Sequence, residues 1–134
     1  MARYLLDTNM CIYLLRRQPE EVARRFAECQ VGDVVMSAIT YAELEYGAQL
    51  SADPVRDRRQ LAALIEDIPV AAFGADAGVA CGPIRKATRE RRKDQLDKLI
   101  AAHAVSLGAT LVTNNEADFL RYPGVSVENW VAAR

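Results

Sequence analysis

Tyr4-Leu5-Leu6-Asp7-Thr8-Asn9, near the amino end of the chain, is a short apolar run that stops at an acidic residue. A continuous apolar run of this length, bounded by polar residues, is typical of a strand buried on both faces of a parallel sheet. Similar runs rich in Val and Leu recur at residues 34–36, 70–73 and 110–113, and residues 125–127 are a candidate edge strand. The sequence therefore predicts four or five short buried strands.

Longer segments with helical spacing separate these runs. The expected helices cover residues 9–16, a segment opened by Pro19, residues 40 to about 47, a segment from Asp53-Pro54 to near Pro69, residues 74 to about 92, and residues 95–107. Gly78, Gly82 and Pro83 predict a kink or a break in the fifth of them. Strands that alternate with helices predict an α/β fold with a mainly parallel central sheet and helices on both faces.

Size and composition are those of one globular domain covering residues 1–134, with 51% hydrophobic and 26% charged residues. No apolar run approaches the roughly 18 residues that a membrane span needs, and Asp7 follows too early for a signal peptide. Cys11, Cys29 and Cys81 are odd in number and lack a CxxC pair, which argues against a disulfide scaffold and a structural zinc site. These features predict a protein of the reducing cytoplasm.

Several acids are expected at one edge of the sheet. Asp7 follows the first strand, Glu43 lies on the helix after the second, and Asp97 lies near the start of the helix that leads to the fourth. The polar residues beyond the fourth strand are Thr113, Asn114, Asn115 and Asp118. Each acid alone also fits a solvated charge or a helix cap, but three converging carboxylates favour a hard cation such as Mg²⁺ or Mn²⁺. Such an ion can promote phosphodiester hydrolysis.

The order of these motifs resembles a known family along nearly the whole chain. The matching stretches are Leu5-Leu6-Asp7-Thr8-Asn9, Ser37 to Gly47 around Glu43, Asp97 to Ala104, Leu111 to Asn115 followed by Asp118-Phe119, and Val127-Glu128-Asn129-Trp130. Together they resemble the PIN-domain ribonucleases, and specifically the VapC toxins of VapBC toxin–antitoxin systems.

The resemblance implies a PIN-like three-layer α/β/α fold and an endoribonuclease that inhibits translation and growth by cutting tRNA or rRNA loops. It implies that Asp7 and Asp97 hold Mg²⁺ or Mn²⁺ and that Glu43 binds the ion or positions a water molecule. It also implies a homodimer and a cognate VapB-type antitoxin that covers the site. The residues expected in a supporting role are Asn9, Thr113, Asn115 and Asp118.

Two departures from the family pattern leave alternatives open. The segment before the third acid is short and charged, so Asp94 competes with Asp97 for the role; the spacing from Asp97 to Ile100-Ala101-Ala102 favours Asp97. Many relatives carry an acid where this chain has Asn115, and Asp118 is a candidate substitute.

A basic segment precedes the third acid. Arg85, Arg89 and Arg92 are spaced i, i+4 and i+7, which would place them on one face of a continuous helix, with Lys86 and Lys93 beside them. The stripe fits a solvated face and an RNA-phosphate contact equally well, although a chain of net charge −1 would need such a contact to bind RNA.

Other features are weaker. His103, the single histidine, is expected to pack on its helix, and no residue pair supports a nucleophilic triad. The aromatic and apolar residues that fit either an antitoxin groove or the core are Tyr13, Leu14, Leu15, Tyr41 and Tyr46. The competing functions are a PIN-like RNA-processing nuclease outside a toxin–antitoxin pair and a receiver-like regulatory module, although Asp7 lacks the acidic neighbour of a receiver. A phosphatase with an aspartyl nucleophile is disfavoured because Asn9 stands where its second Asp belongs.

Overall fold

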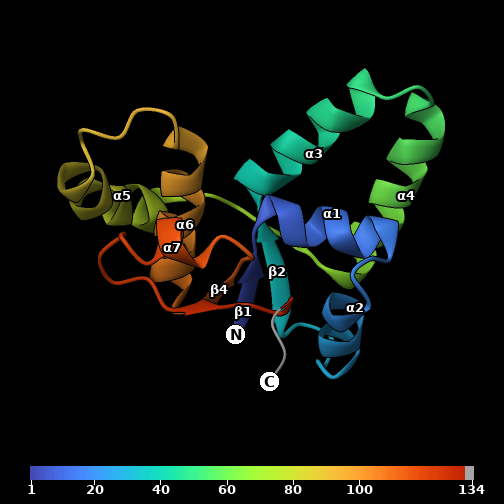
Figure 1. The fold of residues 1–134 in the computed structure, drawn as a ribbon, viewed down its shortest axis with the longest axis horizontal. Helices are drawn as coiled ribbons and strands as arrows, with labels where there is room; N and C mark the ends of the chain where they lie inside the picture. The colour runs from blue at the N-terminus through green and yellow to red at the C-terminus, as the bar shows by residue number, and fades with distance from the viewer. Residues whose placement is uncertain (132–134) are drawn as a thin grey trace.

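The computed structural model describes residues 1–131 and, within them, has one parallel sheet with the strand order β3-β2-β1-β4-β5 (Figure 1). The strands are β1 (Tyr4–Leu6), β2 (Val34–Ser37), β3 (Val70–Ala71), β4 (Thr110–Val112) and β5 (Val127–Glu128). Leu6 lies opposite Met36 on one side and Val112 on the other, so β1 is the central strand. The predicted α/β class is confirmed.

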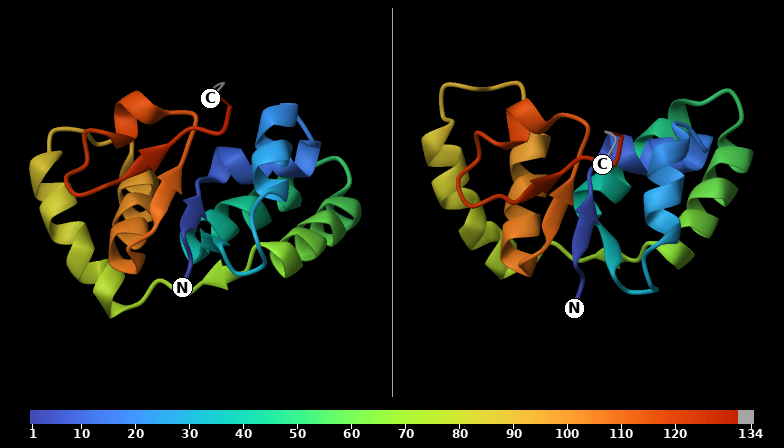
Figure 2. Two further views of the ribbon diagram at one scale, coloured as in Figure 1. Left: turned by 90° about the horizontal axis from the view of Figure 1, so that it is seen from below. Right: turned by 60° about the horizontal axis from the view of Figure 1, so that its bottom comes forward.

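Helices cover both faces of this sheet, which gives three layers (Figures 1 and 2). The helices are α1 (Thr8–Arg16), α2 (Glu20–Ala27), α3 (Ala38–Leu50), α4 (Pro54–Asp67), α5 (Ala75–Ala87), α6 (Gln95–Leu107) and α7 (Glu116–Phe119). Helices α1 to α4 lie on one side, with α3 and α4 forming a hairpin that projects away from the sheet, and α5 and α6 lie on the other side.

The core follows the two-residue alternation of the strands. Leu5 and Leu111 point into a cluster with α5 and α6, whereas Leu6 and Val112 point into a second cluster with α1 to α4 and Trp130. All five side chains are at most 1% exposed. Both faces of β1 and β4 are therefore buried, which explains why these strands are continuous apolar runs rather than alternating ones.

Helix α5 ends earlier than the sequence predicts. It runs as one helix through Pro83 and stops at Ala87, where the Thr88 hydroxyl donates to the carbonyl oxygen of Ile84 at 2.7 Å. In a continued helix the carbonyl oxygen of Thr88 would accept from the N–H of Arg92. Instead it accepts from the backbone N–H of Arg91 at 2.9 Å and from the buried ammonium group of Lys98 at 2.8 Å, and residues 88–94 form a loop.

This loop corrects the predicted basic stripe. Arg85 lies on α5, but Arg89 and Arg92 lie beyond its end, so the three do not share a helix face. Smaller differences are the one-turn helix α7, which the sequence did not reveal, and edge strands β3 and β5 that are shorter or shifted relative to residues 70–73 and 125–127.

The described residues show two further features. In residues 1–131 no helix is both long and apolar enough to cross a lipid bilayer. Cys11, Cys29 and Cys81 are free thiols there, and burial raises the pKa of each one.

Candidate active site

Asp7 is fixed at the carboxyl end of β1. It caps α1, and its Oδ1 accepts the backbone N–H of Met10 at 2.9 Å. The side chain is only 5% exposed, and burial raises the pKa of its carboxyl, with a further rise from the charge of Glu43. Hydrogen bonds from Thr113 and from backbone N–H groups oppose this rise. Asp7 is therefore a carboxylate held in one orientation by donors that favour its charged form.

Thr113 connects Asp7 to the end of β4. Its buried hydroxyl is hydrogen-bonded to Asp7 and accepts the backbone N–H of Asn115 at 2.9 Å. The Asn115 side-chain amide in turn donates to Oδ2 of Asp118 at 2.9 Å. The predicted supporting residues thus form a chain from Asp7 outward, while Asn9 lies exposed on α1 and meets Asp7 through its backbone N–H.

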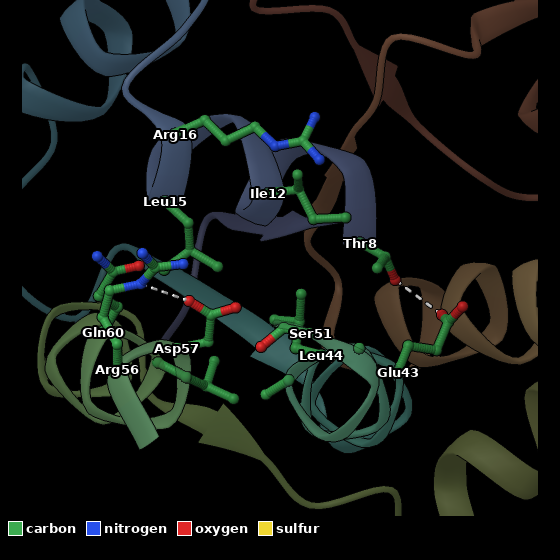
Figure 3. Close-up of a pocket in the computed structure, with 13 residues that line it drawn as sticks. Thr8, Ile12, Leu15, Arg16, Glu43, Leu44, Ser51, Arg56, Asp57 and Gln60 are labelled. Carbon is green, nitrogen blue, oxygen red and sulfur yellow. Dashed lines mark hydrogen bonds and ion pairs between the residues drawn. The ribbon is translucent and has the colours of Figure 1, made fainter. Parts of the chain in front are cut away.

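Glu43 reaches this edge from the second turn of α3. Its Oε1 accepts the hydroxyl of Thr8 at 2.7 Å (Figure 3). The same hydroxyl lies 3.2 Å from Oγ1 of Thr40. Thr8 was not among the predicted site residues, although its position directly after Asp7 places it on the same helix start. It joins α1 to α3 at the site.

Asp97 lies in the first turn of α6 and is half-buried. Burial, followed by the negative charges of Asp7 and Glu43, raises the pKa of its carboxyl to about 6, and Asp94 and Asp118 add to the effect. Asp97 therefore stands in the field of both other predicted site acids. The structure brings Asp7, Glu43 and Asp97 to the edge that the parallel topology predicts.

Asp94 has a different environment. Its carboxylate pairs with Arg91 at 3.1 Å and with Lys98 at 3.5 Å, and it accepts a hydrogen bond from the hydroxyl of Tyr122. Burial raises the pKa of this carboxyl, but the Tyr122 hydrogen bond and the two cations outweigh it, so the pKa lies below its usual range. The Asp94 carboxylate is therefore paired with two internal cations, whereas no Lys or Arg of the described residues pairs with Asp97.

The donor set suits a hard divalent cation. Carboxylate oxygens are the ligands that Mg²⁺ and Mn²⁺ prefer, and the mutual repulsion that raises the pKa of Asp97 is relieved by a bound cation. In this arrangement, however, no three acidic, histidine or cysteine side chains of residues 1–131 are grouped closely enough to hold an ion by themselves. The Glu43 carboxylate is hydrogen-bonded to Thr8, and Mg²⁺ usually keeps several water ligands, so an ion here would be held by fewer than three of these side chains.

A cavity of about 450 Å³ opens beside Glu43, between α1, α3 and α4 (Figure 3). Ile12, Leu15 and Leu44 provide apolar walls, and Arg16 lies on the α1 side. Of the residues considered for a groove, Leu15 lines this cavity, while Tyr13 and Leu14 pack against the core. Tyr46 is 66% exposed, and Tyr41 packs against the core and donates to Glu45 at 2.7 Å.

His103 is buried on α6, where its side chain contacts Ser37 and Phe73 and not the three acids. It is 1% exposed, its Nδ1 lies 2.7 Å from Oγ of Ser37, and its ring contacts that of Phe73 edge to face. The expectation of a packed helix residue is confirmed.

Comparison with known proteins agrees with this geometry. The PIN domain family matches residues 4–125. The chain therefore belongs to the PIN domain family, and its fold is that of a PIN-domain protein.

Individual relatives show to which group of the PIN-domain family the chain belongs. The chain is 35% identical to the tRNA(fMet)-specific endonuclease VapC of Salmonella typhimurium, over 97% of this chain and 99% of that protein. It is also 35% identical to ribonuclease VapC2 of Haemophilus influenzae, over 98% of this chain and all of that protein. A DNA-bound VapBC complex from Salmonella typhimurium superposes with a TM-score of 0.89 at 35% identity, over 97% of this chain and 99% of that one. The chain belongs to the VapC ribonucleases of the PIN-domain family.

Proposed function

We propose that this chain is a metal-dependent endoribonuclease that acts as the toxin of a toxin–antitoxin pair. The observation that carries the proposal is the meeting of Asp7, Glu43 and Asp97 at the carboxyl edge of the sheet, where burial and then the charges of the other two acids raise the pKa of Asp97 to about 6. Relatives that match over nearly the whole chain are named as ribonucleases.

In this proposal the three acids hold a metal ion or position the attacking water. Asp7 and Asp97 hold the ion, Mg²⁺ or Mn²⁺. Burial and the neighbouring acids raise the pKa of both carboxyls, so a bound cation would favour the charged form of each. Glu43, oriented by Thr8, either binds the same ion or positions the attacking water. When bound, the ion would activate water and neutralise charge that develops on the phosphodiester. Asn115 and Asp118 support the edge from α7 through their mutual hydrogen bond.

The substrate in this proposal is a tRNA or rRNA loop, and cleavage in the cytoplasm stops translation. One relative is named as a tRNA(fMet)-specific endonuclease, and similar structures were solved as VapBC complexes. We therefore also propose a VapB-type antitoxin as the partner and a homodimer as the form of the toxin.

The test is to sequence RNA 5′ ends after brief expression of the parent protein and of Asp7→Asn. The substitution keeps the shape of the side chain and removes one negative charge, so cleavage and growth arrest should disappear while the melting temperature is retained. Asp76→Asn, on the exposed start of α5, is the matched control and should remain toxic. Growth arrest by Asp7→Asn at equal protein levels would contradict the nuclease assignment. A small antitoxin gene next to the gene for this chain would favour the toxin hypothesis over a free-standing RNA-processing nuclease.

A further inference from the structure

The end of α5 and the following loop carry an exposed group of cations. Lys86, Arg89 and Arg92, together with Pro83, Ala87 and Glu90, line a surface concavity of about 820 Å³. Arg85 is exposed but does not line it. The α5–α6 surface, as we call the three cations Lys86, Arg89 and Arg92, thus replaces the stripe that helical spacing predicted.

Among the described residues the side chains of these three cations make a single hydrogen bond, from the Arg89 guanidinium to the carbonyl oxygen of Lys86 at 3.3 Å. None of them forms an ion pair with any residue of the described chain, whereas Arg91, between them in sequence, pairs with Asp94 at 3.1 Å and with Asp118 at 3.8 Å. Glu90 is the one acid that lines the concavity. The α5–α6 surface therefore has an excess of positive charge available to an external anion.

The loop beneath these cations is anchored from inside. The Lys98 ammonium group donates to the carbonyl oxygens of Thr88 and Arg91 at 2.8 and 2.5 Å, and the Gln95 amide donates to the carbonyl oxygens of Arg91 and Arg92. With its carbonyl groups bound, the loop presents Arg89 and Arg92 from a fixed backbone. Binding at such a surface pays little for ordering the backbone.

The anchoring also connects this surface to the acidic edge. The loop leads directly into α6, whose first turn carries Asp97, and Arg91 contacts Asp118, one of the acids that raises the pKa of Asp97. In the ribbon views the loop lies on the side of the sheet toward which the strands point (Figures 1 and 2). A polyanion that spans both features would meet the cations first and the acids next.

The net charge of the chain implies that RNA binding needs a local group of cations. The chain has a net charge of −1, and the edge itself gathers carboxylates that repel phosphate. Binding of RNA then depends on a local excess of cations, because phosphate contacts supply most of the sequence-independent affinity. We propose that Lys86, Arg89 and Arg92 bind backbone phosphates of the RNA substrate on one side of the scissile bond. This inference rests on the proposed function.

The experiment compares two triple variants in the Asp7→Asn background, which binds RNA without cutting it. K86Q/R89Q/R92Q removes the surface, and R3Q/R24Q/R59Q removes the same number of charges from α2, α4 and the start of β1. Fluorescence anisotropy with several unrelated single-stranded RNAs is measured over a salt series. Each lost phosphate contact reduces the slope of log affinity against log salt concentration by about 0.7 in magnitude. K86Q/R89Q/R92Q should therefore flatten the slope by roughly two units and weaken the binding of all the RNAs by a similar factor. The control should keep the parent slope.

Other outcomes separate the surface from the function. If the slope is unchanged while the parent protein with Asp7 still cuts RNA, the proposed function still holds and the proposed RNA contact of the three cations is wrong. Normal RNA binding combined with weaker antitoxin binding would overturn it in favour of a protein contact. A parent that neither binds nor cuts RNA would overturn both. Equal melting temperatures for the two triple variants exclude misfolding as the cause, since exposed charges contribute little to stability.

Discussion

The hydroxyl of Thr8 donates a hydrogen bond of 2.7 Å to Oε1 of Glu43, and so joins two residues that are 35 positions apart in the sequence. The bond connects the first turn of α1, which Asp7 caps, to the second turn of α3. It fixes the orientation of the Glu43 carboxylate, and under the proposed function it would act as hydrogen-bonded neighbours of metal ligands commonly do.

Replacing Thr8 with Val tests this role, because Val keeps the shape and removes the hydroxyl. Loss of such an orienting contact typically costs about 10- to 100-fold in metal affinity or activity. Thr8→Val should therefore lower RNA cleavage and Mg²⁺ affinity by about this factor, and Thr8→Ser should restore most of both. Calorimetric Mg²⁺ titration and a cleavage assay measure the two effects. Equal impairment of the Ser and Val variants would point to packing instead.

Asp97→Asn should abolish cleavage and yet stabilise the metal-free protein at neutral pH. The folded pKa of about 6 lies above the usual 3.8, so Asp97 binds its proton more tightly in the folded state. The free energy of unfolding consequently falls as the pH rises from about 4 to about 6. Asn removes this penalty, which we expect to amount to about 1–3 kcal/mol.

The measurement is the difference in melting temperature between Asp97→Asn and the parent over a pH series without metal. The difference should be positive at neutral pH and vanish below the unfolded pKa of 3.8. Added Mg²⁺ should stabilise the parent and leave Asp97→Asn unchanged. A variant that is less stable than the parent at neutral pH would contradict the electrostatic account.

Asp94→Asn should behave in the opposite way, with cleavage largely kept and stability reduced. Its carboxylate is the counter-charge of Arg91 and Lys98, and its folded pKa is lowered, so its contribution is present at neutral pH and lost as the pH falls. We expect a loss of about 2 kcal/mol at neutral pH. Urea unfolding of Asp94→Asn and Asp97→Asn under the same conditions measures both changes in the free energy of unfolding. If Asp94→Asn abolishes cleavage and Asp97→Asn does not, the two acids have been assigned the wrong way round.

Lys98→Met should release the α5–α6 loop. Lys98 is 2% exposed, and the loss of its ammonium group leaves the carbonyl oxygens of Thr88 and Arg91 without this donor. Breaking a buried charged interaction of this kind costs about 3 kcal/mol or more. Hydrogen exchange should accelerate at residues 88–94, and the denaturation midpoint should fall. Lys93→Met, exposed in the same loop, is the control, and an equal effect of both variants would remove the special role of Lys98.

Much of the fold and of the acidic edge could be read from local patterns. Short apolar runs at residues 4–6, 34–36 and 110–112 are strands because both faces of a parallel sheet are buried, and alternation with helices requires parallel crossovers. Asp7 and Thr113 directly follow two adjacent strands, so their meeting follows from the topology alone. These predictions succeeded because they depend on neighbours in sequence and on one general rule of sheet construction.

Tertiary contacts decided the rest. Helical spacing favoured a helix from Gly74 to about Arg92, but the helix ends at Ala87, and Lys98, ten residues beyond Thr88, binds the Thr88 carbonyl oxygen that a longer helix would use. The same long-range bonding turned Arg89 and Arg92 off the helix and bound Asp94 to internal cations. A buried ammonium group must find acceptors wherever the fold supplies them. No local pattern contains that information, so the sequence could name the charged residues of this segment, and only the folded chain determined which of them are paired inside and which face outward.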